Sequence, residues 1–113
     1  MNPEILRKRF FKHVLKKWEL IDRWTENNKC VYVIIGLGYL GQLDNADILY
    51  VGSTTCLKSR YKAHKIPNKI YEAGMIPSLF FIKMEKGFYD YEMKLIKKLN
   101  PIFNKQHKIK YNA

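Results

Sequence analysis

The sequence predicts an α+β domain in which a small three-stranded antiparallel sheet is flanked by helices, with an extra basic amphipathic helix at the N-terminus. Three observations lead to this fold class. Apolar residues recur at helical spacing over the first 25 positions, β-branched and aromatic runs follow, and clusters of Gly, Pro, Asn and Asp separate those runs. At 113 residues the chain has room for one modest core, so we expect a single domain.

The N-terminal segment from Pro3 to Thr25 is predicted to form one basic amphipathic helix. Lys and Arg side chains alternate with its apolar positions, which are Ile5, Leu6, Phe10, Val14, Leu15, Trp18 and Ile21. The polar face of such a helix either lies on phosphates or is the solvated outside of a packing helix. Both interpretations stand at this point.

Three runs of residues are predicted to form the sheet. The run from Cys30 to Ile35 is β-branched and aromatic after its first residue, which is typical of a buried strand, and Ile48 to Val51 follows after a loop rich in Gly, Asp and Asn. We expect these two runs to form an antiparallel hairpin with a long connection. A third strand is expected over Leu79 to Met84.

Three helices are expected in the second half of the chain, over about 53–65, 68–73 and 89–99. Ser53, Thr54 and Thr55 offer N-caps for the first of these helices, and Pro67 is expected to end it. Gly74 is a candidate C-cap for the second. Asn100-Pro101 is expected to stop the last.

The segment Gly36 to Gly41 matches the GxGxxG pattern of dinucleotide-binding proteins, but its context does not fit. That pattern requires a helix that begins at the glycines and an acidic residue about 20 positions later. Here Gln42 to Asp47 resembles a turn, and the region of Arg60 is basic. We interpret the glycines as the wide turn of the hairpin and reject a nucleotide cofactor.

The charge balance indicates a polyanionic partner. Lys and Arg number 21 against 10 Asp and Glu, a net charge of +11 that is spread along the chain. Nucleic acid fits best, because neutralising phosphates releases condensed counterions. The longest apolar run, Val31 to Leu40, is half of the roughly 20 residues that a spanning helix needs, and no signal-peptide core is evident. We expect a cytoplasmic protein, in the host cytoplasm if it is phage-encoded, and no membrane partner.

The two cysteines do not predict a metal site. Cys30 and Cys56 are far apart, and neither belongs to a CxxC motif or has histidines at zinc-ligand spacing. A structural zinc ion is therefore not expected.

A set of polar residues carries the functional prediction: Tyr32, Tyr50-Val51-Gly52, Arg60, His64, Glu92 and Asn104. Their order and spacing resemble the GIY-YIG nuclease family over Cys30 to Asn104, about two-thirds of the chain. Two departures from the family pattern are that Cys30 stands where the family has its leading glycine, and that Val51 replaces an isoleucine. The connection between the two tyrosine motifs is also longer than is typical.

The resemblance implies a DNA endonuclease that hydrolyses phosphodiester bonds with Mg²⁺ or Mn²⁺. It divides the chain into an N-terminal helical extension over 1–28, a catalytic core over 29–104 and a basic tail over 105–113. The segment from Phe103 to Lys108 resembles the tail of the small phage endonuclease II subgroup, which implies a homo-oligomer. The catalytic residues that it implies are Tyr32, Tyr50, Arg60, His64, Glu92 and Asn104.

The same residues make chemical sense by themselves. Arg60 and His64 are four positions apart, so on one helix they would address the same phosphate. Glu92 shares a helical stripe with apolar residues, where an ionised carboxylate is costly unless a cation such as Mg²⁺ or a salt bridge compensates. The plainer alternatives are a solvated charged face for Arg60 and His64, and core aromatics for the tyrosines.

The general base is left open between two residues. Tyr32 is implied by the resemblance as base or water-orienting group, with Tyr50 as its partner, and its ordinary pKa of about 10 would have to be lowered by Arg60 and the metal. His64 competes, because its ordinary pKa is about 6.5. Asn104 would bond substrate or brace Glu92.

A further set of residues is expected to contact substrate: Ser53, Thr54, Lys58, Lys62, Lys65 and Lys105. We expect the phenols, the guanidinium and the carboxylate to surround one phosphate-sized pocket. Two other functions stay open, a catalytically inactive nucleic-acid-binding domain on the same scaffold and a basic membrane-surface or ribosome-associated protein.

Overall fold

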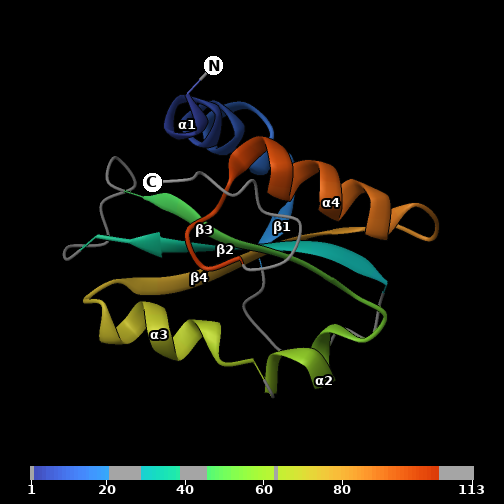
Figure 1. Ribbon diagram of the computed structural model, residues 1–113. Coiled ribbons are helices and arrows are strands. Elements are labelled where there is room, and N and C mark those ends of the chain that lie inside the picture. Colours follow the sequence, from blue (N-terminus) through green and yellow to red (C-terminus); the bar gives the residue numbers. More distant parts are fainter. Residues whose placement is uncertain (1, 21–28, 39–45, 63, 105–113) are drawn as a thin grey trace.

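The computed structural model describes residues 2–20, 29–38, 46–62 and 64–104. Within these residues the chain forms helices on both sides of an antiparallel sheet (Figure 1). The elements in order are α1 (Pro3–His13), the 3₁₀ turn η1 (Leu15–Lys17), β1 (Glu19–Leu20), β2 (Cys30–Leu37), β3 (Asp47–Thr54), α2 (Leu57–Lys62), α3 (Ile66–Glu72), β4 (Ile76–Lys83) and α4 (Phe88–Leu99).

In the described part of the chain the sheet has four strands in the order β1-β4-β2-β3, and all their pairings are antiparallel. The α+β class and the predicted β2–β3 hairpin are confirmed. The predicted number of three strands is wrong, because Glu19 and Leu20, which were expected in a helix, pair with Phe81 and Phe80 of β4.

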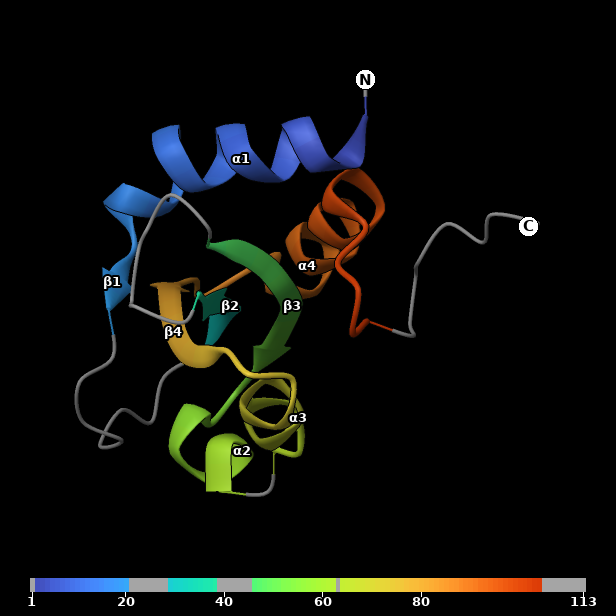
Figure 2. The ribbon, with the colours of Figure 1, turned by 90° about the vertical axis from the view of Figure 1, so that its left-hand side faces the viewer.

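Helices lie on both sides of the sheet (Figure 2), and the side chains of β2 alternate between these two layers. Val31, Val33 and Ile35 belong to the core that α4, α1 and η1 cover, whereas Cys30, Tyr32 and Ile34 belong to the core that α2 and α3 cover. We call these sides the α1/α4 face and the α2/α3 face. Because both faces are buried, the strand reads as a continuous apolar run instead of an alternating one.

The N-terminal helix is shorter than the predicted span from Pro3 to Thr25, since α1 ends at His13. On a continuous helix, Leu15 would lie roughly 140° around the axis from Phe10 and could not share its core. The break at Val14 allows Phe10, Leu15 and Trp18 all to be buried, with the Phe10 and Trp18 rings edge to face at 5.6 Å. Burial of these large side chains outweighs helix continuation.

The second helix also ends before the predicted boundary. α2 stops at Lys62, and His64 lies in the connection to α3, so Arg60 and His64 do not share one helix face as predicted. Pro67 does not terminate a helix but lies in the first turn of α3, where its missing N–H has no intrahelical partner to lose.

The other predicted turns are explained by backbone conformation. Gly74 at φ 84° follows α3, as a left-handed C-cap does, and Asn100 at φ 46° caps α4 before Pro101. Gly36, predicted in the turn, is part of β2, where an added Cβ would lie 2.7 Å from the Leu49 side chain. The rest of the predicted turn, 39–45, lies outside the described residues. No helix of the described part is long and apolar enough to span a membrane.

Candidate functional site

The ring of Tyr32 lies across the backbone of the neighbouring strand. Tyr32 on β2 is opposite Gly52 on β3, and a Cβ added to Gly52 would be 2.5 Å from both Cζ and Oη of the phenol. Only glycine leaves room for this approach. The Tyr-Val-Gly motif therefore has a local meaning, because its glycine makes the space that the other strand's tyrosine occupies.

Three rings gather around this point on the α2/α3 face. Tyr50 is diagonal to Tyr32 across the two strands, and the ring centroids are 6.1 Å apart. The His64 ring is edge to face with both phenols, at 5.7 Å from Tyr32 and 4.8 Å from Tyr50. Tyr32 and His64 are buried, and Tyr50 is half-buried. We call Tyr32, Tyr50, His64 and Arg60 the aromatic site.

Both nitrogens of His64 have partners. The backbone N–H of Ile66 donates to Nδ1 at 3.2 Å, which assigns the proton of the neutral ring to Nε2. Nε2 lies 2.9 Å from the Tyr32 hydroxyl and therefore donates to its oxygen. Burial, helped by the charge of Arg60, lowers the pKa of His64 to about 4, so the ring is neutral near pH 7.

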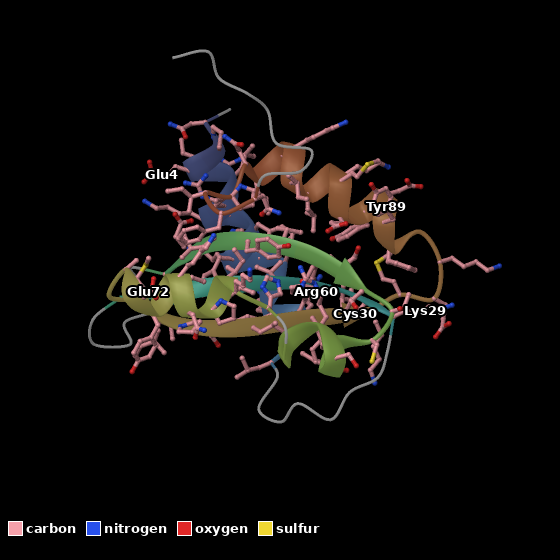
Figure 3. The ribbon with its side chains drawn as sticks, turned by 60° about the horizontal axis from the view of Figure 1, so that its bottom comes forward. Glu4, Lys29, Cys30, Arg60, Glu72 and Tyr89 are labelled. Atoms are coloured by element: carbon pink, nitrogen blue, oxygen red, sulfur yellow. The ribbon has the colours of Figure 1, made fainter. Side chains whose placement is uncertain are left out.

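Arg60 connects the two phenols electrostatically. It projects from α2 toward the sheet (Figure 3), and its charge interacts with both phenols. Burial lowers the pKa of Arg60, but charge interactions and hydrogen bonds with Tyr32 and Tyr50 raise it more, for a net increase. The guanidinium therefore stays charged.

The pKa of Tyr32 is raised, although Arg60 acts on it in the expected direction. Burial, followed by the charge of Tyr50, raises it above the ordinary value, and Arg60 only partly offsets this by charge and hydrogen bonding. The sequence reveals the cation near the phenol, but it does not reveal how completely the ring is removed from water. Desolvation is the larger effect here.

Glu92 comes from the opposite layer. It lies on α4, on the α1/α4 face, and is 8% exposed. Ser53 of β3 donates its hydroxyl to Glu92 Oε1 at 2.9 Å. Ser53 follows Gly52 directly, so the carboxylate and the Tyr32 phenol approach adjacent residues of one strand from the two faces of the sheet. The phenols and the Glu92 carboxylate, which were expected to surround one pocket, instead lie on opposite faces of the sheet near the end of β3.

The potential metal ligands near Glu92 would hold a hard cation such as Mg²⁺ only weakly. Among the described residues no three His, Cys, Asp or Glu side chains group as metal ligands would. Mg²⁺ typically takes one or two carboxylates and completes its shell with water and phosphate oxygens, which a single buried carboxylate permits. Glu92 would be the protein ligand, oriented by Ser53.

Asn104 closes the outer edge of β3. Its Oδ1 accepts from the Val51 N–H at 2.9 Å, and its Nδ2 donates to the Val51 carbonyl at 2.8 Å. The Phe103 N–H adds a bond to the Leu49 carbonyl at 3.0 Å. The side chain thus pairs with an edge strand as a neighbouring strand would. Both of its polar atoms are engaged with backbone.

The remaining predicted contact residues are dispersed. The Thr54 hydroxyl bonds the backbone N–H and carbonyl of Cys56, which shapes the turn into α2. Lys65 is exposed just before α3. Lys58 and Lys62 belong to α2, and Lys105 lies outside the described residues.

Cys30, which stands where the resemblance would put a glycine, occupies a core position. Cys30 is fully buried on the α2/α3 face opposite Thr54, and burial raises the pKa of its thiol to about 12. A thiol in that state is inert. The substitution fills core volume and adds no reactive group.

Two residues of the site were missed as such by sequence reasoning. Gly52 was treated as part of a motif, yet a glycine inside a β-branched run already signals close approach by another group. Ser53 was expected to contact substrate, whereas its hydroxyl is bonded to Glu92. No pattern in the sequence pairs Ser53 with Glu92, because the two residues are 39 positions apart.

Comparison with known proteins gives no relative: no family profile matches the chain, and no curated protein or solved structure matches it significantly.

Proposed function

We propose that this protein is a DNA endonuclease that hydrolyses phosphodiester bonds with the help of Mg²⁺ or Mn²⁺, as its resemblance to GIY-YIG nucleases implies. The observation that supports this most is the buried Tyr32 hydroxyl, which receives a hydrogen bond from His64 Nε2 at 2.9 Å and interacts with the Arg60 guanidinium. A buried phenol with a polarised oxygen, a fixed donor and a cation is costly to build for packing alone.

In the proposed mechanism His64 is a positioning residue instead of the general base. Its Nδ1 accepts from Ile66 and its Nε2–H points to Tyr32, so neither nitrogen is available to take a proton from water. In the metal-free protein the raised pKa of Tyr32 keeps the phenol protonated, which favours a water-orienting role over proton abstraction. Tyr50, beside both rings, helps to place the attacking water or the scissile phosphate.

Arg60 supplies the charge compensation. Its guanidinium stays charged beside the phenols and offers planar donors to phosphate oxygens, on which negative charge increases in the transition state. A divalent cation held by Glu92 would add Lewis-acid stabilisation of that charge. Ser53 holds the carboxylate at the end of β3, next to the strand residue that Tyr32 crosses. Substrate would therefore have to approach this end of the edge strand.

A plasmid-nicking assay with and without Mg²⁺ or Mn²⁺ tests the proposal. We expect wild-type protein to nick only with the metal, and Glu92→Gln, which keeps the shape of the side chain, to lose cleavage roughly 100-fold or more. DNA affinity should stay within about threefold, because the Lys and Arg side chains that neutralise phosphates are all kept. The matched control is Glu72→Gln on the exposed surface of α3, which should cleave normally.

Two results would contradict the proposal in different ways. Metal-dependent nicking that persists in Glu92→Gln would refute the role of the carboxylate. Binding of DNA without nicking by the wild-type protein under any metal condition would favour the catalytically inactive binding domain.

A further inference from the structure

The outer surface of the N-terminal helical segment is strongly basic. Five Lys and Arg side chains are exposed there, against Glu4 as the acidic residue of the same segment, and they are Lys8, Arg9, Lys12, Lys16 and Lys17. Glu4 is 3.4 Å from Lys8 in an exposed ion pair, which contributes little. We call these five residues the α1 basic face.

The other side of α1 is fixed to the domain. Phe10 is buried, and the guanidinium of Arg7 donates to Asp47 at 2.8 Å and to the carbonyl of Leu99 at 3.0 Å. This fixed packing makes α1 part of the core's upper layer. It also makes a membrane partner less suitable, because an interfacial helix inserts its apolar side, and here Phe10 on that side is buried in the protein core.

A second helix adds cations to the same layer. The Arg7–Leu99 bond places the last turn of α4 beside α1, and both helices lie above the sheet (Figure 2). Lys94, Lys97 and Lys98 of α4 are exposed. The aromatic site, in contrast, is on the opposite side of the sheet with α2 and α3.

A purely solvated surface explains this arrangement poorly. Lys8 and Lys12 are four positions apart on one helix face, and like charges at that spacing repel and destabilise the helix. The dipole of α1 compensates for Lys12 in its last turn but not for Lys8 and Arg9 in its middle. A bound polyanion would relieve the repulsion of the whole set.

We propose that the α1 basic face binds the phosphate backbone of duplex DNA separately from the aromatic site, so that one molecule holds two DNA segments on opposite sides of its sheet. This rests on the proposed function only in taking DNA as the ligand. Lys and Arg contacts to phosphates carry no base information, so this second binding is independent of sequence and sensitive to salt.

A bridging assay tests the inference. One duplex is attached to beads, a labelled duplex of unrelated sequence is added, and capture by full-length protein is measured in the Glu92→Gln background at increasing salt. The variant Lys8→Glu, Arg9→Glu, Lys12→Glu should reduce capture by about tenfold or more. It should also lower the salt slope of binding by about 3, because each of the replaced cations neutralises one phosphate. In the otherwise wild-type chain it should nick plasmid within about threefold of normal.

The matched control makes the same charge change elsewhere, in the triple variant Lys29→Glu, Lys69→Glu, Lys86→Glu, whose positions are all exposed and belong to none of α1, η1 and α4. It should capture DNA normally, and circular dichroism should show both triple variants folded. Equal loss of capture in the control, undiminished capture in the α1 variant, or binding of the α1 face to anionic vesicles in preference to DNA would each overturn the inference. Capture does not depend on cleavage, so a wild-type protein that fails to nick would refute the nuclease alone.

Discussion

The two faces of the sheet share the central strand β2 but differ in the chemistry of their buried side chains. On the α1/α4 face Val31, Val33 and Ile35 pack against helices in an almost entirely hydrocarbon core, and the charges are outside. On the α2/α3 face the alternate residues include Tyr32, which lies with His64 and Tyr50 in a core that contains hydroxyl and imidazole groups. Burial of polar groups is tolerated on that side because the groups bond each other.

This difference indicates where each face is vulnerable. The stability of the α1/α4 face depends on how well apolar side chains fill its core. Among the described residues one buried carboxylate, that of Glu92, lies on this face, where it is bonded to Ser53 at the sheet edge. The α2/α3 face depends on the orientation of its aromatic rings, since a small displacement of one ring disturbs its packing with the two others. Substitutions that remove apolar volume on the α1/α4 face should therefore lower stability. Substitutions that reorient a ring on the α2/α3 face should lower activity more than stability.

The largest effect is expected at Gly52. In Gly52→Ala the new Cβ would lie 2.5 Å from Tyr32 Cζ and Oη, so the phenol must move. We expect cleavage to fall roughly 100-fold, as misplaced catalytic groups do, with a loss of about 1–3 kcal/mol in the free energy of unfolding.

Gly36→Ala is the control for Gly52→Ala. Its Cβ would meet the ends of the Leu49 and Met75 side chains, at 2.7 and 2.9 Å, and not the phenol. Denaturant unfolding should give a similar loss of stability, while nicking per folded molecule stays near normal. Equal loss of cleavage in both variants would mean that crowding of this face, and not the position of Tyr32, controls activity.

A more moderate effect is expected at Asn104. Asn104→Ala removes both hydrogen bonds to the backbone of Val51, which is completely buried, and should lower the free energy of unfolding by about 2–3 kcal/mol. Cleavage per folded molecule should change less than about threefold, because both polar atoms bond backbone. Asn68→Ala, on the exposed surface of α3, is the control. A folded Asn104→Ala protein with severely reduced turnover would restore the predicted contact with substrate.

The smallest effect is a pH dependence of stability from His64. Its pKa is about 4 in the folded protein and about 6.5 when unfolded, so between these values the unfolded chain binds more protons. Stability should therefore fall as pH decreases from 6.5 to 4, by about 1–2 kcal/mol after solvent screening is allowed for.

Denaturant unfolding at several pH values checks this contribution. His64→Asn should flatten the slope of stability against pH in that range, whereas His13→Asn, at an exposed position of α1, should leave it unchanged. An identical slope in wild type and His64→Asn would mean that the imidazole is not desolvated in the folded protein.

Local patterns in the sequence predicted a good part of this architecture. The apolar run of β2, the stripe of α4 and its stop at Asn100-Pro101 were recognisable, because strand and helix periodicity is a property of neighbouring residues. The pairing of Tyr32 with Gly52 was not predicted, because the long connection between the two strands left their register open. The net charge of +11 follows from the composition alone.

Contacts between distant segments decided the rest. The strand β1, the break of α1 at Val14 and the placement of His64 outside a helix follow from which side chains find room in a shared core, and no local window contains that information. Likewise, the sequence determined that Glu92 lies on a helix among apolar residues, but only the tertiary structure decided that α4 covers the face opposite the phenols. The physical reason is that periodicity states which side of an element is buried, whereas long-range packing selects what it is buried against.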